Sequence, residues 1–152
     1  MRWLSWIMNA GFMPYRQKRL LLDEIVRQCD FALIGYRDAS TAVQKNENQR
    51  MWYSLHALVG AAVHLQQLLG CAQELEGILG DLPSPLTQPD LANTADWAEL
   101  VRNCQGARCS FDPHTAILML FGRVFELQPM LAAIAELRKQ AEDEVQLLKA
   151  IV

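Results

Sequence analysis

Two long stretches of the chain place hydrophobic residues at alternating intervals of four and three, the spacing that gathers them on one face of a helix. Over residues 16–44 this face contains Ile25, Cys29, Ala32, Tyr36, Ala39 and Val43. In the next stretch, which runs to about residue 70, it contains Met51, Leu55, Leu58, Ala62, Leu65 and Leu69. The pattern predicts two long helices, each with a buried face.

The residues that join these helices predict where the second one starts. Asn46 is followed three positions later by Gln49, which is the arrangement of a capping box at a helix N-terminus. Within the second helix, Ala57, Gly60 and Ala61 thin one side. That side leaves room for another helix to approach closely.

A third periodic stretch follows Asp112 and Pro113, which are typical of an N-cap carboxylate before a proline at the first helical position. Its hydrophobic series is Ile117, Leu120, Val124, Leu127, Leu131, Ile134, Ala141, Val145 and Leu148, with Arg138 as the one polar residue in the series. Pro129 should kink this helix, because a proline in a helix interior removes a backbone hydrogen bond. No segment shows a pattern that predicts a β-sheet.

Between the second and third stretches the sequence is rich in glycine and proline. Gly77, Gly80, Pro83, Pro85 and Pro89 predict a long irregular connection, and residues 93–104 predict a short helix. The expected fold is therefore all-α, an antiparallel four-helix bundle of three long helices and one short one with a long Pro/Gly-rich connection. We expect one domain over residues 16–150, preceded by an extension or short docking helix at residues 1–15.

The overall composition predicts a soluble chain with a single hydrophobic core. The chain has 152 residues, of which 51% are hydrophobic and 20% charged, with a net charge of −3. This length suits one domain, and the charge excludes the broad basic surface that sequence-independent nucleic-acid binding needs. No run approaches the ~20 apolar residues of a membrane span, and we expect no signal peptide. The four cysteines lack the spacing of a disulfide framework, so we expect a cytoplasmic protein with reduced thiols.

The sequence offers little support for a metal or cofactor. His56 and His64 lie eight residues apart on one helix, which separates them by about 12 Å along its axis. The run Cys104-x4-Cys109-x4-His114 lacks a fourth ligand and the usual zinc spacing. Phosphate-loop, dinucleotide-binding and haem-attachment motifs are missing from the sequence as well. We therefore predict no metal site and no cofactor.

Arginine near histidine is the remaining arrangement with catalytic meaning. In metal-free RNA cleavage, one such group stabilises phosphate charge while the other moves protons on and off the reacting oxygens. The candidate groups are Arg50 with His56, Arg108 with His114, and Arg102 beside Asn103. Each of these groups is also compatible with a purely structural role.

Three segments together resemble a known superfamily. QRMWYSLHALVGAAVHLQQLLG (residues 49–70) and LLLDEIVRQCDFALIGYRDA (residues 20–39) resemble the second and first helices of a group of bacterial helical proteins within the HEPN superfamily. In that group a Pro-containing loop leads to a helix ending in Arg-Asn, followed by a histidine and then by Phe-Asp. Here PSPL precedes ELVRN, and SFDPH follows further on. The likeness covers about two thirds of the chain.

The resemblance implies a role in bacterial defence or toxin–antitoxin systems. The superfamily includes metal-independent endoribonucleases, whose site usually forms across a dimer, and members that lost the motif and act as RNA-binding or interaction modules. Arg102 and Asn103 match the motif, but Gln105 to Arg108 fill the place of its histidine. His114 could take the place of that histidine only if the turn folds it back. The resemblance therefore implies a catalytically degenerate, RNA-associated module. The arginine and histidine pattern adds Arg50, His56 and Arg108 as binding residues.

The alternative hypothesis is a non-enzymatic helical scaffold. It would bind a protein partner through the segment that contains Trp3 and Trp6 and through the long last helix. On either hypothesis we expect a homodimer, because the hydrophobic faces of three long helices, together with Trp52 and Trp97, exceed what one small bundle usually buries.

Overall fold

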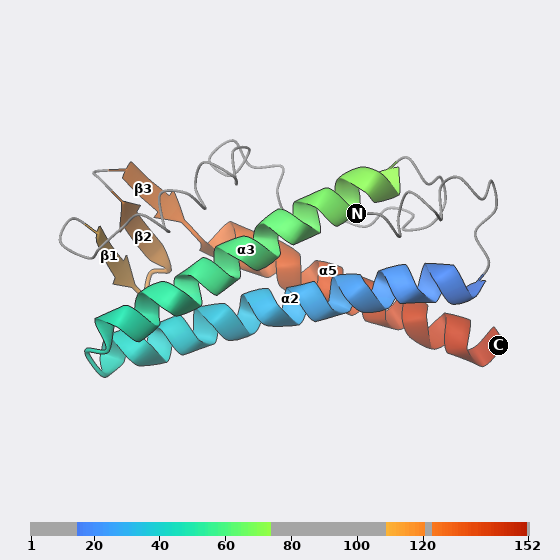
Figure 1. The fold of residues 1–152 in the computed structure, drawn as a ribbon, viewed down its shortest axis with the longest axis horizontal. Helices are drawn as coiled ribbons and strands as arrows, with labels where there is room; N and C mark the ends of the chain where they lie inside the picture. Colours follow the sequence, from blue (N-terminus) through green and yellow to red (C-terminus); the bar gives the residue numbers. More distant parts are fainter. Residues whose placement is uncertain (1–14, 74–108, 121–122, 152) are drawn as a thin grey trace.

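Three long helices and a small antiparallel sheet form the part of the chain that the structure describes. This computed structural model describes residues 15–73, 109–120 and 123–151. The elements in chain order are α2 (Tyr15–Gln44), α3 (Asn48–Gln73), β1 (Cys109–Asp112), β2 (Ile117–Leu120), β3 (Arg123–Glu126) and α5 (Gln128–Ile151). Figure 1 shows α2 and α3 as an antiparallel pair, with α5 running along α2 and the sheet near the turn that joins α2 to α3.

The hydrophobic faces predicted for the first two helices are confirmed. All six residues predicted for the face of α3 are buried, and four of the six predicted for α2 are fully buried. The other two, Tyr36 and Val43, pack partly buried against the same core. Helix spacing in the sequence was therefore sufficient to place this half of the core.

The turn between α2 and α3 differs from the predicted capping box. Asn46 has a φ of 58°, a left-handed conformation that asparagine tolerates better than most residues. The Glu47 amide donates to the carbonyl of Ala42 at 2.8 Å, and the Asn46 amide donates to that of Val43 at 3.2 Å. These two bonds form a Schellman motif, so Asn46 ends α2 rather than starting α3.

Close helix approach occurs at Gly35 of α2, whereas the sequence pointed to the small residues of α3. A Cβ added at Gly35 would lie 3.0 Å from the backbone oxygen of Ser54 and 3.1 Å from the backbone nitrogen of Leu58. A Cβ added at Gly60 would meet nothing within 4 Å. The thin side of α3 thus remains open toward the surface.

The prediction of an all-helical chain was wrong after residue 108. β1, β2 and β3 form a three-stranded antiparallel sheet in that order, in which Phe111 pairs with Leu118 and Leu118 with Phe125. These three side chains are buried on one face, whereas Met119 and its partner Val124 are exposed. The alternation has a period of two, as expected for strands with one face on the core.

Asp112 and Pro113 therefore do not start the last helix. They open the turn between β1 and β2, and α5 begins only at Gln128. Pro129 is the second residue of α5, where no intrahelical hydrogen bond is lost, so the predicted kink in a helix interior does not arise. Of the predicted series, Leu131, Ile134, Ala141, Val145 and Leu148 are buried on α5, and Val124 is exposed on β3.

Polar contacts join α2 to the C-terminal elements. Arg138 of α5 donates to Asp30 of α2 at 2.5 Å and to Glu142 on its own helix at 2.5 Å. The hydroxyl of Tyr36 donates to the carbonyl of Pro113 at 3.0 Å, and its ring meets Phe111 edge to face with centroids 5.6 Å apart. The polar residue in the predicted last-helix series thus anchors α5 to α2.

Several predictions fall outside the described residues. They are the N-terminal extension, the long Pro/Gly-rich connection and the short helix at residues 93–104. The described parts are mostly helical with a small sheet, and a four-helix bundle is not shown. Among the described helices, none is both long and apolar enough to cross a membrane.

The two glycines of the helical pair give a matched stability test. Gly35→Ala should lower the free energy of unfolding by about 1–3 kcal/mol, because the added methyl group meets backbone atoms that must move. Gly60→Ala should raise it by about 0.5–1 kcal/mol, because alanine favours the helix and the space is open. Urea unfolding of both variants measures the difference. Equal effects at the two positions would contradict the close approach of α2 and α3 at Gly35.

Candidate functional site

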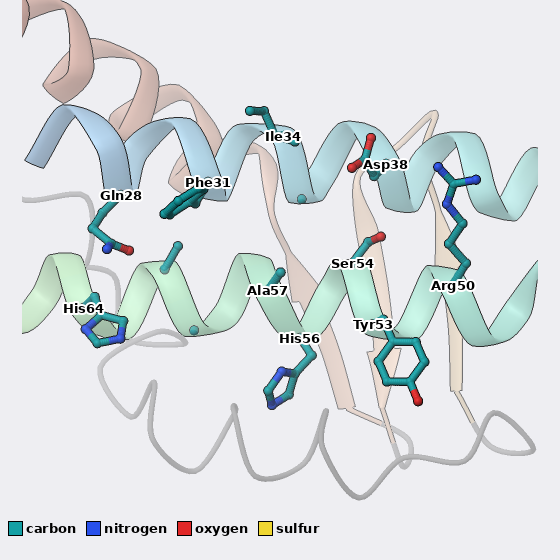
Figure 2. A pocket seen from close by; sticks show the side chains of 13 residues that line it. Gln28, Phe31, Ile34, Asp38, Arg50, Tyr53, Ser54, His56, Ala57 and His64 are labelled. Carbon is teal, nitrogen blue, oxygen red and sulfur yellow. The ribbon is translucent and has the colours of Figure 1, made fainter. Parts of the chain in front are cut away.

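A surface hollow runs between α2 and α3. Five residues of α2, from Gln28 to Asp38, and eight residues of α3, from Arg50 to His64, line a groove of about 550 Å³. We call it the α2–α3 groove. Figure 2 shows it with the sheet and α5 behind the two helices. The core face of the helical pair is therefore occupied, and the groove lies on the other face.

Large hydrophobic side chains stand exposed along this groove. Phe31 and Ile34 of α2 are 50% and 42% exposed, and Tyr53 of α3 is 68% exposed. Large hydrophobic groups are usually buried unless they meet a partner, and a cluster of exposed ones marks an interaction surface. The lining of the groove thus includes three such side chains.

Part of the α3 side of the groove is formed by small residues. Ala57, Gly60 and Ala61 follow one another along it, and the open space at Gly60 makes a local hollow. These are the small residues that the sequence marked as room for another helix. Within the described residues no helix fills that room.

Charged groups of opposite sign lie on the two sides of the groove. Asp38 is on α2, and Arg50, His56 and His64 are on α3; Figure 2 shows Arg50 and Asp38 at the same end. Arg50 pairs with Glu47 at 3.3 Å, with both side chains well exposed. Such a surface pair contributes only about 0–1 kcal/mol, so Arg50 stays available for another partner.

A carboxylate beside the opposite end of the groove is already well satisfied. Glu24 accepts hydrogen bonds from Gln28 at 3.0 Å and pairs with Arg27 at 2.5 Å. Burial tends to raise the pKa of Glu24, but these hydrogen bonds and the charges of Arg27 and His64 outweigh burial and hold the pKa below its usual value. Glu24 is therefore ionised at neutral pH and suited neither to donate nor to accept a catalytic proton.

The structure brings together only two of the residues predicted for a site. Arg50 and His56 both line the α2–α3 groove. His114 is exposed in the turn between β1 and β2 and does not line the groove. Arg102, Asn103 and Arg108 lie outside the described residues.

The turn that holds His114 is organised by Asp112. Its carboxylate accepts a hydrogen bond from the Thr115 hydroxyl at 2.9 Å and from the His114 amide at 3.0 Å. These bonds lower the pKa of Asp112, with the Thr115 hydroxyl as the main cause. The carboxylate thus acts as the cap of a tight turn, and the imidazole of His114 takes no part in these bonds.

Sequence reasoning missed Phe31, Ile34 and Asp38 as members of a surface site. All three lie off the hydrophobic face predicted for the first helix. The available signal was that two large hydrophobic residues stand outside that face, since such residues on the polar side of a helix need an explanation. His64 was considered only as a metal ligand.

Neither a metal centre nor a reactive thiol emerges from the described residues. They hold no group of three or more side chains that could bind a metal ion. Cys29 is a free, fully buried thiol, and burial, with the nearby charge of Asp30, raises its pKa from 9.0 to about 12. A protonated thiol is a poor nucleophile. Cys29 is therefore part of the core.

Comparisons with protein-family models, with curated proteins and with solved structures find no match to this chain. The resemblance to the HEPN superfamily therefore stays a hypothesis that rests on the quoted segments. The function of the chain is therefore inferred from the residues of the α2–α3 groove.

The raised pKa of Cys29 predicts protection from alkylation. At pH 8 the folded chain should not be modified by iodoacetamide at Cys29, whereas the urea-unfolded chain should be. The stability that the protonated thiol provides is full below about pH 9 and is lost as the pH rises towards about 12. Mass spectrometry of the peptide that contains Cys29 gives the measurement. Modification of the folded chain at the unfolded rate would show that Cys29 is accessible.

Proposed function

We propose that this chain is a non-enzymatic interaction subunit that binds a helical protein segment along the α2–α3 groove. The observation that carries the proposal is the exposure of Phe31, Ile34 and Tyr53 along one groove of an otherwise well-packed helical pair. Burying such side chains against a partner releases about 25 cal/mol for each Å² of apolar surface. The free thiol of Cys29 suits the cytoplasm, where we place this function.

The dimensions of the groove suit a helix better than a small molecule. From Gln28 to Asp38 the α2 wall spans eleven residues, with a rise of about 15 Å. From Arg50 to His64 the α3 wall spans fifteen residues, with a rise of about 21 Å. A partner helix of about three to four turns would follow both walls, with hydrophobic residues at intervals of three and four.

The polar groups of the groove would orient the partner rather than perform chemistry. The groove has an acidic group on one side and basic groups on the other, which favours a partner helix with charges of both signs beside its hydrophobic face. Asp38, His56 and His64 are thus assigned to partner recognition, and the groove is proposed as a binding surface.

A second candidate function is the RNA-associated module of a bacterial defence or toxin–antitoxin system that the HEPN resemblance implies. One observation favours it: Arg50, His56 and His64 all project from α3 at the groove, and such groups bind phosphates. Against it, the negative charges of Asp38 across the groove and of Glu47 beside Arg50 repel phosphate groups. The protein-interaction function thus has the stronger support.

A photo-crosslinker tests the interaction function inside cells. Replacing Tyr53 with p-benzoylphenylalanine should give covalent adducts with protein, because this position is exposed on the groove. The same crosslinker at Leu147, which is equally exposed on α5, serves as the matched control. Adding Gly60→Leu should abolish the Tyr53 adducts by filling the groove. Adducts that persist with Gly60→Leu, or that form equally well from position 147, would refute a binding role of the groove.

RNA binding at low salt separates the two candidate functions. The interaction function predicts that the purified chain neither retains nor cleaves single-stranded RNA. The RNA function predicts binding that weakens with salt and that falls with Arg50→Ala or with Arg102→Ala. Neither substitution should change stability by more than ~0.5 kcal/mol if the side chain is exposed, as Arg50 is. Salt-dependent RNA binding that Arg50→Ala removes would favour the RNA function over our proposal.

A further inference from the structure

We propose that the partner in the α2–α3 groove is the same groove of a second copy of this chain, so that α2 of each protomer lies on α3 of the other. This inference rests on the proposed function, because it names the occupant of the same groove. Three features of the groove support it: its shape, its symmetry and its charges.

The two walls of the groove have complementary shapes. The α2 wall carries the protruding side chains of Phe31 and Ile34, and the α3 wall carries the small residues around Gly60. A Cβ at Gly60 would meet nothing within 4 Å, so the hollow there is unfilled within the protomer. A partner that supplies large side chains to the α3 wall and small ones to the α2 wall would match both. A second copy supplies this combination.

The register of α2 against α3 places the side chain of Phe31 at the same height as the hollow at Gly60. Gly35 packs on Ser54 and Leu58, which fixes the relative heights of the two antiparallel helices. Phe31 lies one turn before Gly35, so it comes level with residues one turn after Leu58 on α3, near Gly60 and Ala61. A two-fold axis parallel to the helices keeps these heights and moves α2 onto the partner's α3. Phe31 of each copy then meets the hollow at Gly60 of the other.

Symmetry distinguishes this arrangement from the other simple one. A two-fold axis perpendicular to the helices would set α2 against the partner's α2, with large side chains facing large side chains and the hollow on α3 left open. The axis parallel to the helices instead gives a self-complementary contact, in which the same pair of surfaces occurs twice. The shape of the groove therefore selects one two-fold arrangement.

The charges agree with the same axis. Asp38 and Arg50 lie at one end of the groove, on α2 and α3 respectively. An axis parallel to the helices keeps the position of every residue along the helix axis. Asp38 of each protomer therefore lies at the same end of the interface as Arg50 of the other protomer. Opposite charges are thus brought together twice across the interface. An axis perpendicular to the helices would not place Asp38 opposite Arg50, because it sets α2 against the partner's α2 and α3 against the partner's α3.

Light scattering on the purified full chain tests the proposal with a matched set of variants. The wild type should have twice its 17.2 kDa chain mass at tens of micromolar. Gly60→Leu, which fills the hollow, and Phe31→Ser, which removes the protrusion, should each raise the dimer dissociation constant by at least about tenfold. Leu147→Ser, which removes a similarly large and even more exposed hydrophobic side chain from α5, should leave the dimer intact. Circular dichroism of the variants checks that each one folds, and Gly60→Leu should not lower helix content, since leucine favours helix more than glycine does.

Each other outcome has a distinct meaning. A wild-type monomer whose Tyr53 crosslinks in cells are lost with Gly60→Leu would overturn the self-association and leave the proposed function standing with another partner. A wild-type monomer without such crosslinks would overturn both. A dimer that Gly60→Leu and Phe31→Ser do not weaken would place the interface elsewhere and refute the inference.

Discussion

The close approach of α2 and α3 at Gly35 is the contact on which the rest of the structure depends. Because Gly35 has no side chain, the backbone of α2 reaches the backbone of α3 at Ser54 and Leu58. This contact sets the register of two helices of 30 and 26 residues, and the register determines which side chains of α2 stand level with which side chains of α3. On the outer face of the pair, no third helix among the described elements covers the side chains.

The two faces of the helical pair are used in different ways. One face is covered by the sheet and α5, and both are held to α2 by specific polar contacts in addition to the hydrophobic core: Tyr36 with Pro113, and Asp30 with Arg138. The hydrogen bond that Arg138 donates to Asp30 also raises the pKa of Arg138. The opposite face keeps its hydrophobic side chains exposed. Exposed hydrophobic groups that gather on one face support the interaction function that we propose.

The sequence predicted the helical half of the fold well, because the faces of α2 and α3 repeat without interruption over many turns. It failed between Asp112 and Pro129 for a physical reason. Apolar residues are so frequent in β2 and β3 that they satisfy a helical spacing and a strand alternation equally well. Whether these residues form a helix or strands is decided by their pairing across the sheet, which a single sequence does not reveal. The groove itself was not predicted. Arg50 and His56 were named as candidates for RNA binding and line the groove, but Phe31 and Ile34 became conspicuous only when the position of α5 showed which face stays uncovered.

The polar contact between Asp30 and Arg138 also has a consequence for the order of folding. These residues are 108 positions apart in the chain, whereas α2 and α3, and the neighbouring strands of the sheet, are only a few residues apart in sequence. Closing a long loop costs more chain entropy than closing a short one, and contacts between distant residues slow folding. We therefore expect the helical pair and the strand hairpins to form early, and the docking of α5 onto α2 to be the late step that completes the native state.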